Sequence, residues 1–208
     1  MGLIKATRYT EVEAVNMLLA TVDMPSIDSI DTTYPLVEKA VGILNNVFRE
    51  VISLGLNFSK EVIRLYPDTT GAIIMPEKVV RIANPVKSLN ASYFTMRGRK
   101  LYDLNRNTTD FSEEGYKQGI DVEVVVAIPF NDMPETAKNY IIKRSARIFQ
   151  ALVQGDGVRY QYTAQEELEA FTAMQRDSNE EGNYNILDGY SGRRPVNRRS
   201  NPFPIGGR

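Results

Sequence analysis

Residues 34–55 read YPLVEKAVGILNNVFREVISLG, and this stretch decides the fold class of the chain more than any other. Apolar residues recur in it every three or four positions, which is the period of an amphipathic α-helix. Pro35 suits the first helical turn, and Gly55 suits the left-handed position just past the last turn. We therefore predict a helix over Tyr34–Leu54, whose apolar stripe needs a partner helix or a sheet.

Three further helices are predicted on either side of this one. Upstream, Thr10 and Glu13 have the spacing of a capping box, at the start of a helix over Thr10–Val22. Downstream, helical periodicity returns over Pro134–Val153 and again over Arg159–Asp177. In the last helix an apolar side is expected to face inward and an acidic side outward. The inward residues are Tyr162, Leu168, Phe171 and Met174, and the outward ones are Glu166, Glu167 and Glu169.

The segment between the two helix pairs has the pattern of β-structure. Segments 92–96 and 100–104 flank Arg97-Gly98-Arg99, which is typical of a hairpin turn. Ile120–Ile128 is rich in valine, as a buried strand would be. Shorter β-branched runs occupy 72–75 and 79–82. We expect about five or six antiparallel strands here.

The predicted fold class is therefore α+β. Two N-terminal and two C-terminal helices are expected to form a four-helix bundle, with an antiparallel β-subdomain inserted between them and an extended C-terminal tail. The expected division is 1–55 for the first helices, 56–130 for the β-subdomain, 131–182 for the second helices and 183–208 for the basic tail.

Composition excludes several kinds of chemistry. The 208-residue chain contains neither cysteine nor histidine, so disulfides, thiol nucleophiles, Ser-His-Asp catalysis and Cys/His metal sites are all impossible. No apolar run approaches the roughly 18 residues of a membrane span, so no membrane anchor is expected. We expect no catalytic residue, cofactor or bound metal, which favours a binding or structural protein.

Two groups of cations suggest interaction surfaces, although the net charge of the chain is only −1. One is a basic row on the third predicted helix, which could contact nucleic acid or could be an ordinary solvated face. The other is the tail, where paired arginines stand among Pro, Asn and Gly and where apolar residues could anchor the segment on a neighbour. The row is Lys138, Lys143, Arg144 and Arg147; the tail residues are Ile186, Leu187, Tyr190, Arg193, Arg194, Arg198 and Arg199.

Paired carboxylates leave a hydrolytic alternative open. A glycan hydrolase needs two carboxyl groups facing one cleft, and Glu114 and Asp121 are the candidates that conflict least with the predicted elements. Asp121 and Glu123 share the outer side of a predicted strand, where an ordinary polar face is the simpler interpretation. A DNA-binding packaging accessory that acts through the arginine-rich tail is the second alternative.

Three stretches, in register and at matching overall length, carry a resemblance to a known family. They are EAVNMLL at 13–19, NDMPE at 131–135 with SAR at 145–147, and YNILDG at 184–189. Over about residues 8 to 190 the chain resembles the tail tubular protein A family, the head-to-tail adaptors of T7-like short-tailed phages. It departs from that family at Val22-Asp23, where Gly-Glu is usual, and at Leu56, where Trp is usual.

This resemblance implies a structural virion protein rather than an enzyme. It implies a ring, of twelve copies in the family, between the portal protein and a nozzle protein like tail tubular protein B, with tail fibres attached at the junction. The genome would pass through the ring without sequence-specific binding. The protein would lie in the virion tail, after assembly in the host cytoplasm.

Overall fold

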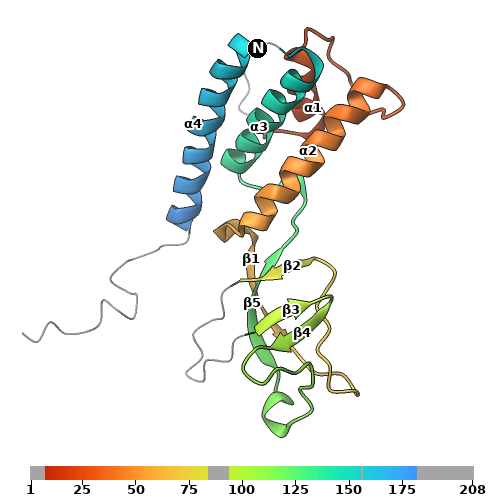
Figure 1. Ribbon diagram of the computed structural model, residues 1–208, viewed down its shortest axis with the longest axis vertical. Coiled ribbons are helices and arrows are strands. Elements are labelled where there is room, and N and C mark those ends of the chain that lie inside the picture. The colour runs from red at the N-terminus through yellow and green to blue at the C-terminus, as the bar shows by residue number, and fades with distance from the viewer. Residues whose placement is uncertain (1–7, 84–93, 156, 182–208) are drawn as a thin grey trace, which may run out of the picture.

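The computed structural model describes residues 8–83, 94–155 and 157–181, and these form an α+β protein (Figure 1). Its helices lie at one end of an elongated molecule and its strands at the other. The helices are α1 (Glu11–Ala20), α2 (Pro35–Leu54), α3 (Glu135–Val153) and α4 (Gly157–Glu181). The strands are β1 (Lys60–Leu65), β2 (Val79–Ile82), β3 (Phe94–Arg97), β4 (Lys100–Asp103) and β5 (Ile120–Val126). Short 3-10 helices are η1 (Asn57–Ser59), η2 (Glu114–Tyr116) and η3 (Phe130–Asp132).

The predicted start of the first helix and both predicted ends of the second agree with the structure to within one residue, whereas the first helix ends at Ala20 rather than at Val22. The hydroxyl of Thr10 accepts a hydrogen bond from the backbone N–H of Glu13, and the Glu13 carboxylate accepts one from the N–H of Thr10, which completes the capping box. Pro35 opens α2, and Gly55 ends it with a left-handed φ of 67°. These local signals fix the start of α1 and both ends of α2.

Helix α3 lies between the other helices and contacts all three of them. Two clusters of buried apolar side chains hold this arrangement together. One joins α1 to α2 and α3 around Leu18, Ala40 and Phe149. The other joins α2, α3 and α4 around Val51, Ile141 and Met174, and it includes Val125 of β5. The second cluster therefore connects the helical end to the strands.

The described strands form two antiparallel sheets. The larger has the order β1-β5-β2, with the central strand β5 pairing β1 from Lys60↔Val125 to Leu65↔Ile120. The smaller is the predicted hairpin β3-β4, whose turn contains Gly98 with a φ of 62°. The segment 72–75 is not a strand and contributes a single bridge, Ile74↔Lys100. A third apolar cluster around Ile73, Leu101 and Phe111 lies between the two sheets.

The expected facing of α4 is wrong at two positions. Leu168 is 64% exposed rather than inward, and the side chain of Glu167 is only 12% exposed rather than outward. The buried stripe instead follows Ala170, Met174 and Ser178, which are four residues apart. Because this stripe packs against the core, Leu168 faces solvent and Glu167 faces the arginines of α3.

Candidate functional site

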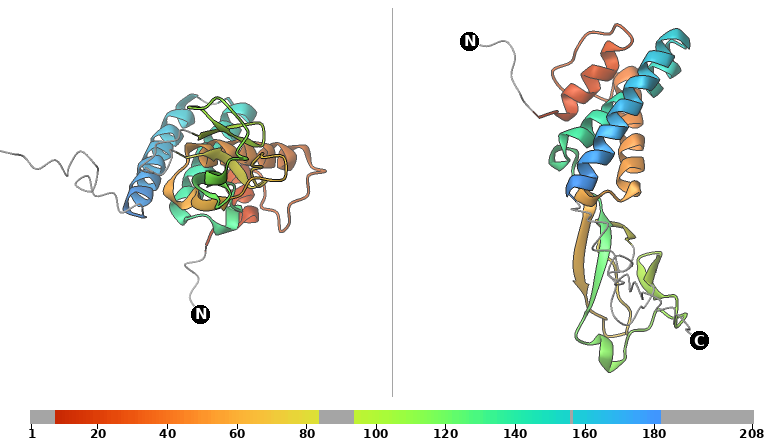
Figure 2. Two further views of the ribbon diagram at one scale, coloured as in Figure 1. Left: turned by 90° about the horizontal axis from the view of Figure 1, so that it is seen from below. Right: turned by 90° about the vertical axis from the view of Figure 1, so that its left-hand side faces the viewer.

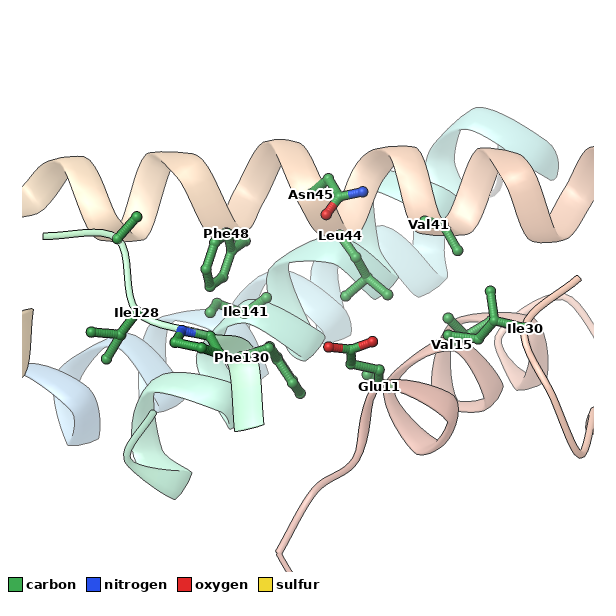
Figure 3. A pocket seen from close by; sticks show the side chains of 13 residues that line it. Glu11, Val15, Ile30, Val41, Leu44, Asn45, Phe48, Ile128, Phe130 and Ile141 are labelled. Carbon is green, nitrogen blue, oxygen red and sulfur yellow. The ribbon is translucent and has the colours of Figure 1, made fainter. Parts of the chain in front are cut away.

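An apolar groove of about 620 Å³ opens between α1, α2 and the segment 127–130. Figure 3 shows α2 along one wall, with α1 and the segment that carries Phe130 along the other. Its volume falls in the range of pockets that hold small ligands or a few side chains of a partner. The lining residues are Glu11, Ala14, Val15, Ile30, Val41, Leu44, Asn45, Phe48, Ala127, Ile128, Pro129, Phe130 and Ile141.

Side-chain hydrogen bonds fix the walls of this groove. The Asn16 amide donates to the Ile27 carbonyl at 2.9 Å and accepts from the Ile27 N–H at 2.7 Å, so it holds the loop 21–34, which carries Ile30, against α1. At the start of α1, Glu135 accepts from the N–H of Tyr9 at 3.0 Å, and Lys138 donates to the Tyr9 carbonyl at 3.3 Å. The groove is therefore bounded by elements that are tied to one another.

Among the residues that line the groove, all of them described, Glu11 is the single charged one. Its carboxylate points into the space between α1 and α2 (Figure 3). Glu11 occupies the first turn of α1, where a negative charge is also favourable for the helix dipole. The groove thus combines an apolar lining with one anion.

The basic row predicted on α3 does not form one solvent-facing surface. Lys138 is fully buried and donates to Glu135 at 2.8 Å. Lys143 pairs with Glu166 of α4 at 2.6 Å, while Arg144 pairs with Glu50 of α2 and Glu167 of α4. Arg147 pairs with Glu167 as well. Lys143, Arg144 and Arg147 therefore join α3 to α2 and α4, which supply the partner carboxylates, whereas Lys138 pairs with Glu135 of α3 itself.

Glu167 is the centre of the α3–α4 ion pairs. Burial disfavours its charge, but hydrogen bonds from Arg147 and Arg144 outweigh that effect and lower the pKa of its carboxyl group below the ordinary value. The hydrogen bonds of Arg144 to Glu167 first, and then to Glu50, raise the pKa of Arg144 above its ordinary value. Glu167 is therefore a carboxylate held in its charged form between two guanidinium groups.

The tail residues proposed as contacts lie outside the described residues. These are Ile186, Leu187, Tyr190, Arg193, Arg194, Arg198 and Arg199. The described chain stops at Glu181, the last residue of α4. Near that end, the hydroxyl of Ser178 accepts a hydrogen bond from the N–H of Asn57, so α4 is attached to η1 at the junction with the strands.

The two carboxylates considered for hydrolysis each have their own cation. Glu114 is exposed and pairs with Lys117, and Asp121 pairs with Arg64 directly across the β1-β5 ladder. The Arg64 hydrogen bond lowers the pKa of Asp121. Across the described residues there is no group of three or more acidic side chains that could hold a metal ion. None of the helices in those ranges is long and apolar enough to cross a bilayer.

Sequence reasoning missed the groove, although α2 carries a signal for it. Val41, Leu44 and Phe48 follow a helical period and are each only partly buried, beside a second stripe through Ala40, Val47 and Val51 that is fully buried. When the apolar face of a helix is wider than the stripe that its own fold buries, the remaining apolar surface is available to a partner.

The described residues thus form an α+β protein with an apolar groove between α1 and α2. A family model described as "Tail tubular protein" matches residues 12–184, and the chain belongs to this family. It is accordingly a structural component of a phage tail, located in the virion. A comparison with curated proteins gives no significant match.

Proposed function

We propose that this tail tubular protein is the head-to-tail adaptor, which joins the portal protein to the tail nozzle. The family match over residues 12–184 carries this proposal, together with the resemblance of three sequence stretches to adaptors of short-tailed phages. The nozzle partner would be a protein like tail tubular protein B, and tail fibres would attach at the junction. No reaction and no cofactor belong to this role.

The adaptor forms a ring, of twelve copies by the family resemblance. A cyclic ring needs two unlike surfaces on every copy, because one copy presents its first surface to the second surface of the next. The molecule has two different flanks, with α4 on one side of α3 and α2 with the loop 21–34 on the other (Figures 1 and 2). This asymmetry supports a head-to-tail ring.

The elongated shape of the molecule also supports contacts with different partners at its two ends. In this proposal residues 1–55 and 131–182 form a four-helix bundle that contacts the portal and the neighbouring copies. Residues 56–130 contribute the β-subdomain on the side of the nozzle and fibres, and 183–208 form an interaction tail. The genome passes through the ring without sequence-specific binding, after assembly in the host cytoplasm.

Negative-stain electron microscopy of the protein, alone and mixed with the portal protein of the same genome, tests this role. We expect a second ring below the portal in the mixture. Deletion of 184–208 is expected to leave a folded protein that no longer forms this ring. Lys100→Glu, in the β3-β4 hairpin at the opposite end from the helices, is the control and should keep the ring. A stable monomer that never associates with the portal at moderate salt contradicts the proposal.

A further inference from the structure

The groove between α1 and α2 has the properties of a receptor for an extended segment. Six of its apolar side chains are only partly buried in the described part of the chain: Ile30, Val41, Leu44, Phe48, Ile128 and Phe130. Covering such surface with an apolar partner is favourable because water is released from it. Since Glu11 is the one charge in the lining, the best partner combines apolar side chains with a cation.

Residues 182–208 have this chemistry. Ile186, Leu187 and Tyr190 come within nine residues of the end of α4, and Arg193-Arg194 follow them. From Gly189 onward there are five arginines and no acidic residue. Extended chain spans about 3.3 Å per residue, so the distance from Glu181 to Arg194 reaches up to about 43 Å. That is long enough to leave the parent molecule and cross to an adjacent one.

The position of this segment indicates which copy receives it. It begins at the end of α4, and α4 lies on the opposite side of α3 from the groove (Figures 1 and 2). To reach the groove of its own molecule, the segment would have to pass around α3. In a head-to-tail ring, by contrast, the side of one copy that carries α4 faces the side of the next copy that carries the groove.

Residues 1–7 are the competing occupant, with Leu3, Ile4 and Lys5. The chain that leads into α1 runs away from α2 (Figure 3), and its backbone at Tyr9 is held on α3 by Glu135 and Lys138. Residues 1–7 would therefore have to reverse direction to enter the groove, which favours the segment beyond α4.

We propose that residues 186–194 of one copy bind in the α1–α2 groove of the next copy, with Ile186 and Leu187 against its apolar lining and an arginine beside Glu11. This inference rests on the proposed ring and names the contact that links its neighbours. Every copy would both give a segment and receive one, so the ring would close through a continuous chain of such contacts.

The absence of cysteine from the chain allows a direct test by disulfide cross-linking. Asn45→Cys places a thiol on the groove, and Leu187→Cys places one on the segment. The two single variants are mixed, assembled with the portal protein, oxidised and separated without reductant. We expect a dimer-sized product that contains both chains. Asn46→Cys is the matched control, because Asn46 is the exposed neighbour of Asn45 and does not line the groove, and we expect at least tenfold less product from it.

The double variant Asn45→Cys with Leu187→Cys distinguishes the source of the segment. A ladder of linked chains supports binding between copies, and an internally linked monomer overturns it. A second double variant, Asn45→Cys with Ile4→Cys, tests the competing occupant. An internal disulfide in this variant overturns the proposal and assigns the groove to residues 1–7. Microscopy of the same samples separates the two proposals. Rings without the cross-link overturn only this inference, while the absence of rings overturns the adaptor role and this contact with it.

Discussion

Arg144 of α3 and Glu167 of α4 form a hydrogen-bonded ion pair, with Nη1 of the arginine 2.8 Å from Oε1 of the glutamate. The Arg144 side chain is 29% exposed and that of Glu167 is 12% exposed. The same guanidinium also reaches Glu50, so one side chain ties α3 to both α2 and α4. The order of the helices at this end therefore depends on charge as well as on apolar packing.

Replacing Glu167 with glutamine should destabilise the fold. Glu167→Gln keeps the size of the side chain but removes the charge that Arg144 and Arg147 both use. Hydrogen bonds to charged groups contribute about 1.5–3 kcal/mol, so we expect the free energy of unfolding to fall by about 2 kcal/mol. Urea denaturation measures the change. Glu166→Gln is the control, because Glu166 is half exposed and pairs with Lys143 at the surface, where such pairs contribute about 0–1 kcal/mol. Equal effects of the two substitutions would contradict the prediction.

Stability should depend on pH through the same residue. The folded pKa of Glu167 is lowered, so its contribution is fully present above the unfolded pKa, near the ordinary value of 4.5, and is lost as the pH falls through the folded pKa. In that window the unfolded state binds more protons, and the free energy of unfolding rises with pH. Denaturation between about pH 3 and pH 6 should therefore give a shallower rise for Glu167→Gln than for the unsubstituted protein. A residual rise remains because contacts also lower the pKa of Glu135 and Asp121. Identical slopes in the two proteins would exclude this role for Glu167.

Replacing each of two glycines with alanine should change the stability of the fold in opposite directions. Gly55 has a φ of 67°, and a Cβ there would lie 2.3 Å from the Arg81 guanidinium and 2.9 Å from Val125. Gly55→Ala is therefore expected to cost about 1–3 kcal/mol. Gly42 lies within α2 and a Cβ there meets nothing within 4 Å, so Gly42→Ala should stabilise by about 0.5–1 kcal/mol. Thermal unfolding of both variants tests the pair, and a loss of stability in Gly42→Ala would contradict the prediction.

Removing the charge of Lys138 should loosen the attachment of α1. Lys138→Met deletes the donor to Glu135 and to the Tyr9 carbonyl, in a side chain that is only 1% exposed. Breaking a buried pair costs about 3–5 kcal/mol, and we expect about 2 kcal/mol because Glu135 is 42% exposed and remains hydrated. Adding Glu135→Gln should recover part of the loss. If the stability loss of the double variant equals or exceeds the sum of the two single losses, Lys138 and Glu135 do not act as a pair.

The sequence predicted the elements well where their signals are local. The capping box of Thr10 and Glu13, the left-handed end at Gly55 and the turn at Gly98 each depend on residues within four positions of one another. Such contacts join residues that are close in sequence, so a single sequence is enough to predict them. A strand was also predicted over 120–128, from its run of valines, and the structure has it as β5 over 120–126.

The same reasoning failed for α4 because its facing is set by a partner. The apolar pattern put Leu168 inside and Glu167 outside, and the structure has the opposite at both positions. Arg144 and Arg147 lie about twenty residues away in sequence, and nothing in the sequence of α4 shows that they would lie against Glu167. Lys138 follows the same rule only through the backbone of Tyr9, 129 residues away, since its other partner, Glu135, is three residues away on the same helix.

By itself, then, the sequence determined the helices, most of the strands, the α+β class and the resemblance to tail tubular proteins, since each depends on short-range patterns. Only the tertiary structure decided that the cations of α3 join helices and that α1, α2 and the segment 127–130 enclose a groove around Glu11. The reason is physical. An ion pair or a groove between elements depends on which faces the fold brings together, and no single element contains that information.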